Sequence, residues 1–93
     1  MIKHIVLFKL KNRRDRQRAL DALNGVKGKI EGLLDLEAGA DFLGSERSCD
    51  IALVCTLKDK AALDFYQAHP LHQPVKKLMH ELRESSVAAD YEV

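Results

Sequence analysis

The 93-residue sequence has no tryptophan, only two prolines, and just three phenylalanines and two tyrosines. It also lacks a long apolar run, since the first apolar segment, IVLFKL (residues 5–10), is already interrupted by Lys9. No stretch approaches the roughly 20 apolar residues that cross a bilayer, and the first residues do not form the apolar core of a secretory signal. We therefore expect a cytoplasmic protein with no membrane partner.

The sequence has no strong excess of charge of one sign, because its formal net charge is +1. No whole-protein field therefore attracts nucleic acid or an anionic membrane. One basic cluster, KLKNRRDRQR (residues 9–18), either contacts phosphate or forms the solvated start of a helix. We favour the helix start and expect no nucleic-acid partner.

Cysteine is also scarce, with two residues that lie six positions apart near one expected strand. In an extended strand this spacing separates Cys49 from Cys55 by about 20 Å, whereas a disulfide needs Cα atoms within about 7 Å. We expect no bridge, and Cys55 has the pattern of a small buried hydrophobic residue rather than a nucleophile.

Apolar patterning predicts four strands and three helices. Continuous apolar runs indicate strands that are covered on both faces, and spacings of three and four indicate helices. The expected strands are residues 2–10, 34–43, 50–57 and 86–93, and the expected helices are 15–32, 59–69 and a third from Pro74.

Finer features are predicted within these elements. Gly32 ends the first helix, and Gly39 is a candidate bulge in a strand that buries Leu34, Leu36 and Ala38 on one face. Asp59 caps the second helix, which Pro70 ends, and Pro74 suits the first turn of the third. In the last strand, Tyr91 is expected to point into the core together with Val87, Ala89 and Val93.

The order β-α-β-β-α-α-β predicts an α+β fold over residues 1–93, with helices on one face of a four-stranded antiparallel sheet. The first and third strands, however, are apolar on both faces. A bare apolar face would exceed the few hundred Å² that monomers expose. We therefore expect a homodimer in which two sheets pack face to face around a barrel-like interior.

The segment FYQAHPLHQP (residues 65–74) holds the main candidate site residues. His72 can exchange protons at neutral pH, Tyr66 can donate a hydrogen bond to a developing oxyanion, and His4 is a polar group on an apolar strand face. Each also has a structural interpretation as a buried group with a satisfied hydrogen bond.

Two other histidines have structural interpretations. A positively charged His69 suits the end of a helix, and His80 is expected on a solvated helix face. No cysteine or carboxylate joins the histidines at ligand spacing, so we expect no metal site. No nucleotide fingerprint is present, so we expect no cofactor.

Five segments together resemble the stress-responsive dimeric α/β-barrel (Dabb) family. In order they are IKHIVLFKLK, EAGAD, DIALVCTLKDKAAL, YQAHPLHQPV and DYEV. The resemblance implies a ferredoxin-like subunit that pairs through its sheet into a barrel. One plant branch of the family contains a polyketide cyclase that works without metal or coenzyme, and its site tyrosine and histidines match Tyr66, His72 and His4.

Three functions remain open from the sequence. The first is a binder of a small apolar or carbonyl ligand, or a coenzyme-free proton-transfer enzyme of the cyclase kind in which His72 takes the proton and Tyr66 polarises the carbonyl. The second is a stress-associated dimer with a packed interior and no chemistry. The third, nucleic-acid binding through residues 9–18, is the least favoured.

Overall fold

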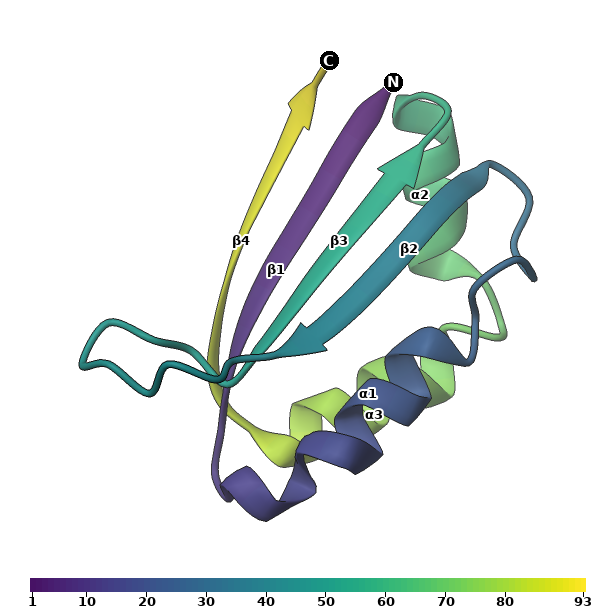
Figure 1. The fold of residues 1–93 in the computed structure, drawn as a ribbon. Helices are drawn as coiled ribbons and strands as arrows, with labels where there is room; N and C mark the ends of the chain where they lie inside the picture. The colour runs from purple at the N-terminus through teal and green to yellow at the C-terminus, as the bar shows by residue number, and fades with distance from the viewer.

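A computed structural model describes all 93 residues and has the predicted order of elements. The four strands form one antiparallel sheet in the order β2-β3-β1-β4 (Figure 1). This confirms the α+β ferredoxin-like β-α-β-β-α-α-β fold. The elements are β1 (Ile2–Leu10), α1 (Arg16–Asn24), β2 (Leu33–Ala40), β3 (Ile51–Leu57), α2 (Lys60–Ala68), α3 (Gln73–Leu82) and β4 (Arg83–Glu92).

The first helix is shorter than predicted, because α1 ends at Asn24 and residues 25–32 form turns. Gly28 and Gly32 have φ values of 75° and 85°, which a right-handed helix cannot accommodate. A Cβ atom at Gly32 would lie 2.8 Å from Cβ of Ala62, so glycine also permits this turn to approach α2. The prediction of a continuous helix over 15–32 is therefore wrong in its second half.

Strand β2 differs from the prediction in its register. The irregularity lies between Leu33 and Asp35, whereas Gly39 pairs regularly with Ala52. This one-residue shift buries Leu33 and Leu36 and leaves Leu34 56% exposed. Because side chains alternate along a strand, a bulge at this point reverses the face of the residue that precedes it. The predictions for Gly39 and Leu34 are wrong.

The ends of α2 and the start of α3 lie where the sequence predicts them. The Asp59 carboxylate accepts a 2.8 Å hydrogen bond from the Ala62 backbone N–H, as expected for an N-cap. Helix α2 ends before His69, whose backbone is extended, as expected for a residue that precedes a proline. Pro74 lies in the first turn of α3.

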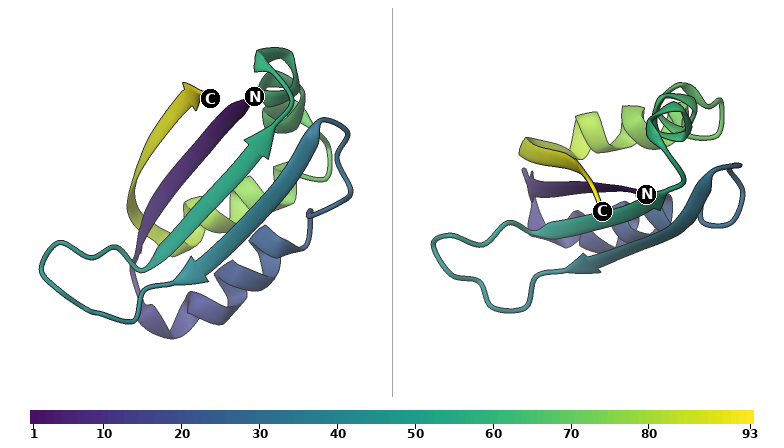
Figure 2. Two further views of the ribbon diagram at one scale, coloured as in Figure 1. Left: turned by 45° about the horizontal axis from the view of Figure 1, so that its top comes forward. Right: turned by 90° about the horizontal axis from the view of Figure 1, so that it is seen from above.

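The two faces of the sheet differ sharply. All three helices lie on one side, and the other side is bare in Figure 1 and in the left view of Figure 2. On the covered side, Ile2, His4, Phe8 and Leu10 of β1 are buried. On the open side, Leu7 is 37% and Val87 63% exposed.

Tyr91 lies on the open side of the sheet, because it pairs with Lys3 in the β1–β4 register. It is 46% exposed in the subunit. The prediction that Tyr91 belongs to the subunit core is therefore wrong. The physical reason is that only one side of the sheet has helices to cover it.

Candidate functional site

A cavity of about 700 Å³ opens between α3 and strands β1 and β4, on the covered side of the sheet. Its floor includes His4, Val6 and Phe8 of β1, and its walls include Tyr66 and His72. The cavity exists because the helix layer stops short of β4. Every residue of β4 except Arg83 is exposed, including those that face the helices. A fully packed interior, which the chemistry-free hypothesis requires, is therefore absent on this side.

The corner between α2 and α3 positions the aromatic side chains of the site. Tyr66 points inward from the last turns of α2 and is 1% exposed. Pro70 interrupts the helix, and the His72 backbone N–H donates to the His69 carbonyl at 2.9 Å to close a tight turn. His72 therefore enters the structure at the start of α3 and is 6% exposed.

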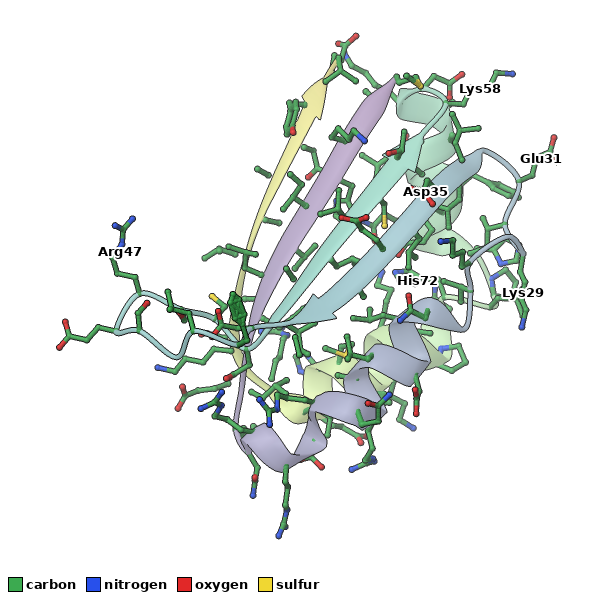
Figure 3. All side chains as sticks on the ribbon, viewed as in Figure 1. Lys29, Glu31, Asp35, Arg47, Lys58 and His72 are labelled. Carbon is green, nitrogen blue, oxygen red and sulfur yellow. The ribbon has the colours of Figure 1, made fainter.

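The three predicted site residues lie together. The rings of Tyr66 and His72 have centroids 4.2 Å apart with planes tilted by 30°. The rings of His4 and Tyr66 meet edge to face at 6.1 Å. Figure 3 shows His72 between the sheet and the helices. A strand and a helical corner separated by about 60 residues in sequence thus converge on one end of the cavity.

His4 has a carboxylate partner that sequence reasoning did not identify. Its Nδ1 lies 2.5 Å from Oδ1 of Asp90, which is directly opposite in the β1–β4 register. In a neutral ring, this bond to the carboxylate places the proton on Nδ1 and leaves the Nε2 lone pair for a ligand. The available signal was that His4 is a polar residue on an apolar face of its strand, but the last strand holds several polar residues and its register was unknown.

His72 has no hydrogen-bond partner for its buried Nδ1 atom. Burial lowers the pKa of His72 to about 4, and the nearby positive charge of Lys76 acts in the same direction, followed by His4 and His69. The ring is therefore neutral at pH 7. An unpaired buried nitrogen costs about 1–3 kcal/mol.

Tyr66 is held as a neutral phenol. Burial raises its pKa well above the ordinary range, and Cys55 adds to the shift. The Cys55 thiol donates a weak hydrogen bond to the Tyr66 hydroxyl at 3.8 Å, which leaves the phenolic proton for another acceptor. Burial also raises the pKa of Cys55 to about 11, so this thiol is not a nucleophile at neutral pH.

His69 and His80 lie apart from the buried trio. The Nδ1 atom of His69 accepts a hydrogen bond from the Leu71 backbone N–H at 3.0 Å. His69 is the C-cap residue of α2, as its structural interpretation predicted. His80 is exposed at the cavity rim, where its Nδ1 lies 3.1 Å from Nη2 of Arg83.

Neither the basic segment (residues 9–18) nor a cluster of metal-binding side chains provides a competing site. Arg13 pairs with Asp50 at 3.3 Å and Arg18 with Asp15 at 3.4 Å, so part of this charge is used to stabilise local structure. No group of three or more histidine, cysteine or acidic side chains is arranged to hold a metal ion. None of the helices has the length and apolar character needed to span a membrane.

Residues 2–93 match the model of the stress-responsive A/B barrel domain, Dabb. The chain belongs to the Dabb family. Among solved structures, a dimeric ferredoxin-like protein of unknown function from Bacteroides fragilis is 29% identical, with a TM-score of 0.86 and coverage of 99% of this chain and 95% of that one. A dimeric relative from Thermobifida fusca, also of unknown function, is 25% identical, with a TM-score of 0.88 and coverage of 99% and 90%. No curated protein matches the Dabb chain.

Proposed function

We propose that this Dabb protein is a homodimer that binds a small carbonyl-containing ligand in the cavity of each subunit. The observation that carries the proposal is the cavity itself, whose lining includes His72, Tyr66 and His4, with Asp90 bonded to His4. Its volume of about 700 Å³ lies within the range of small-molecule sites. Apolar side chains such as Val6, Phe8 and Met79 share its lining with polar and charged ones.

The open face of the sheet supports the homodimer. Its central rows are apolar in register, with Ile5 beside Val54 and Ala89, and Leu7 beside Ala52 and Val87. A contiguous apolar surface of this kind is unstable in water, and a second copy of the same sheet covers it with two-fold symmetry. The relatives from Bacteroides fragilis and Thermobifida fusca are described as dimeric.

The binding chemistry follows from the protonation states. The Tyr66 phenol donates to a carbonyl oxygen. Its raised pKa keeps the proton in place, and its own oxygen already accepts a hydrogen bond from the Cys55 thiol. The neutral His72 ring lies beside it, with the two ring planes tilted by 30°. These groups suit a neutral polar function such as a ketone or a hydroxyl, because a buried charge would lack a counterion.

A neutral naphthylamine dye tests the binding function. We expect N-phenyl-1-naphthylamine to become fluorescent on binding, and Ser86→Trp to abolish the signal by filling the cavity that Ser86 lines. Arg47→Gln, at the tip of the β2–β3 loop, is the control and retains binding (Figure 3). Dye binding that survives Ser86→Trp would place the ligand elsewhere and contradict the proposal.

The His4–Asp90 pair favours a second candidate, catalysis of proton transfer next to a carbonyl. The low pKa of His72 makes it a weak base, so we assign the base to His4 rather than to His72. His4 Nε2 takes a proton from the carbon beside the carbonyl, the C–H electron pair forms the enolate, and Tyr66 hydrogen-bonds its oxygen. Asp90 orients the ring and stabilises the imidazolium that forms.

Deuterium exchange tests this second candidate. With phenylacetone in D₂O as the probe, we expect the protein to accelerate exchange at the carbon between the ring and the carbonyl, as followed by proton NMR. His4→Gln should reduce the enzymatic rate by about 10²-fold or more. His80→Gln, at the rim, is the matched control. Equal exchange with His4→Gln and wild type would eliminate the catalytic candidate and leave the binding proposal intact.

A further inference from the structure

The rim of the cavity carries an excess of positive charge. Three cationic side chains of the α3 region line it, Lys76, Lys77 and Arg83, against one carboxylate, Glu81. None of the three cations forms a salt bridge within the chain. Since the protein as a whole has a net charge of only +1, this concentration of unpaired cations is local.

Helical spacing places two of these cations along the cavity. His72 and Arg83 are the N-cap and C-cap residues of α3 and Lys76 lies in its first turn, so spacings of four and seven positions place all three along the same side of the helix. Arg83 lies about 16 Å beyond His72 at the helical rise of 1.5 Å per residue. In the sheet, Arg83 pairs with Leu10, whereas Asp90 pairs with His4 at the opposite end of β1.

The two ends of the cavity therefore differ in charge. At the His4 end, the His72 ring is neutral, and the Asp90 carboxylate behind His4 adds negative rather than positive charge. At the Arg83 end, the guanidinium has only the His80 ring as a side-chain partner, and its remaining N–H donors are available. Lys76 lies between the ends, with its ammonium group donating to the Gln67 carbonyl at 3.2 Å.

We propose that the ligand is an organic acid: its carbonyl-bearing or ring-bearing body lies against Tyr66 and His72, and its anionic group lies at the α3 rim beside Lys76 and Arg83. This inference rests on the proposed ligand-binding function and specifies its substrate class. Arginine binds a carboxylate through two parallel hydrogen bonds, so Arg83 is the main anchor and Lys76 adds a point charge.

Two dyes with the same ring skeleton test the charge directly. 8-Anilinonaphthalene-1-sulfonate carries an anionic group, and N-phenyl-1-naphthylamine lacks it. We expect the wild-type protein to bind the sulfonate at least tenfold more tightly than the neutral dye by fluorescence titration. Ser86→Trp should abolish the binding of both, because both occupy the same cavity.

Charge variants supply the matched comparison. Arg83→Gln and Lys76→Gln should each weaken sulfonate binding about five- to tenfold and change binding of the neutral dye less than twofold. Arg83→Lys retains the charge and should recover part of the loss. Arg47→Gln removes a cation from the β2–β3 loop, far from His72 in Figure 3, and should change neither titration.

The outcomes separate the two proposals. Equal affinity for the two dyes, or a loss with Arg83→Gln no greater than with Arg47→Gln, would overturn the inference about the acid and preserve ligand binding. Failure of both dyes to bind would overturn the proposed function together with this inference. Circular dichroism of each variant checks that it is folded.

Discussion

The two faces of the sheet in this Dabb protein are built from the same strands, yet they have different compositions and neighbours. On the covered face, apolar side chains pack under three helices, and two histidines are buried among them. On the open face, the central rows are apolar and no element of the chain covers them. Alternation along β1 thus divides one strand between a candidate ligand site and a candidate subunit interface.

The comparison shows where polar groups are tolerated. The helices on the covered face do not extend over β4. The His4–Asp90 pair and the cavity lie at this margin, and the half-exposed Asp90 remains in contact with water. The open face carries its charged side chains at the margins of the apolar rows, as at Lys3. The proposed ligand site is therefore associated with the incomplete helix layer, and the proposed subunit interface with the bare side.

The largest effect is expected from a charge on the open face. Leu7→Glu places a carboxylate at the centre of the proposed interface, once in each subunit, where it has no counterion. We expect sedimentation equilibrium to show that dimer association is weakened by at least a hundredfold in affinity. Leu71→Glu, an exposed leucine in the α2–α3 turn, should leave the dimer intact. A Leu7→Glu dimer of unchanged affinity would rule out pairing through this face.

The next largest effect tests the register of β2. Leu36 is 0% exposed on the covered face, so Leu36→Ala should reduce the free energy of unfolding by about 2–5 kcal/mol. Leu34→Ala, at the neighbouring bulge, should change it by less than about 0.5 kcal/mol. Urea unfolding at one fixed protein concentration measures both. Equal costs would show that the bulge does not lie between Leu33 and Asp35.

His72 should make stability depend on pH. Its pKa is lowered from 6.5 to about 4 by burial, with Lys76, His4 and His69 contributing, so the unfolded chain binds one more proton between those values. The contribution of His72 to the free energy of unfolding is therefore complete above about pH 6.5. It decreases by about 2–3 kcal/mol as the pH is lowered toward 4. His72→Leu should remove this part of the slope in urea titrations, whereas exposed His80→Gln should retain it. Identical slopes for His72→Leu and wild type would contradict a buried neutral ring.

The smallest effect compares the two tyrosines, one on each face. Tyr66→Phe removes the acceptor of the Cys55 thiol and should cost about 0.5 kcal/mol, since the bond is weak. Tyr91→Phe, on the open face, should cost less than that in the isolated subunit. Thermal unfolding of both in the Leu7→Glu background gives the comparison without the dimer. A larger loss for Tyr91→Phe would reverse the assignment of the two faces.

Apolar patterning was sufficient for the order and type of the elements, because long periodic segments and caps such as Asp59 are local signals. The same pattern failed at Gly28 and at the β2 bulge. A glycine with positive φ looks like any helix interruption in sequence, and a one-residue shift is determined by pairing with β3 rather than by β2 itself.

The candidate site was predictable in its histidines and tyrosine, but not in its electrostatics. His4, Tyr66 and His72 were selected by residue type and family resemblance, and the structure places them together. The pairing of His4 with Asp90 depends on the β1–β4 register, and the neutral state of His72 depends on burial at the helical corner. Neither property has a signal in a short sequence window.

Methyl NMR of the wild-type dimer during titration with N-phenyl-1-naphthylamine tests the central claim most directly. Val6 and Leu53 line the cavity on the covered face, whereas Leu7 and Val87 lie on the open face. The account predicts saturable shifts of the Val6 and Leu53 methyl signals, with those of Leu7 and Val87 unchanged. Shifts confined to Leu7 and Val87 would place the ligand between the sheets and contradict it.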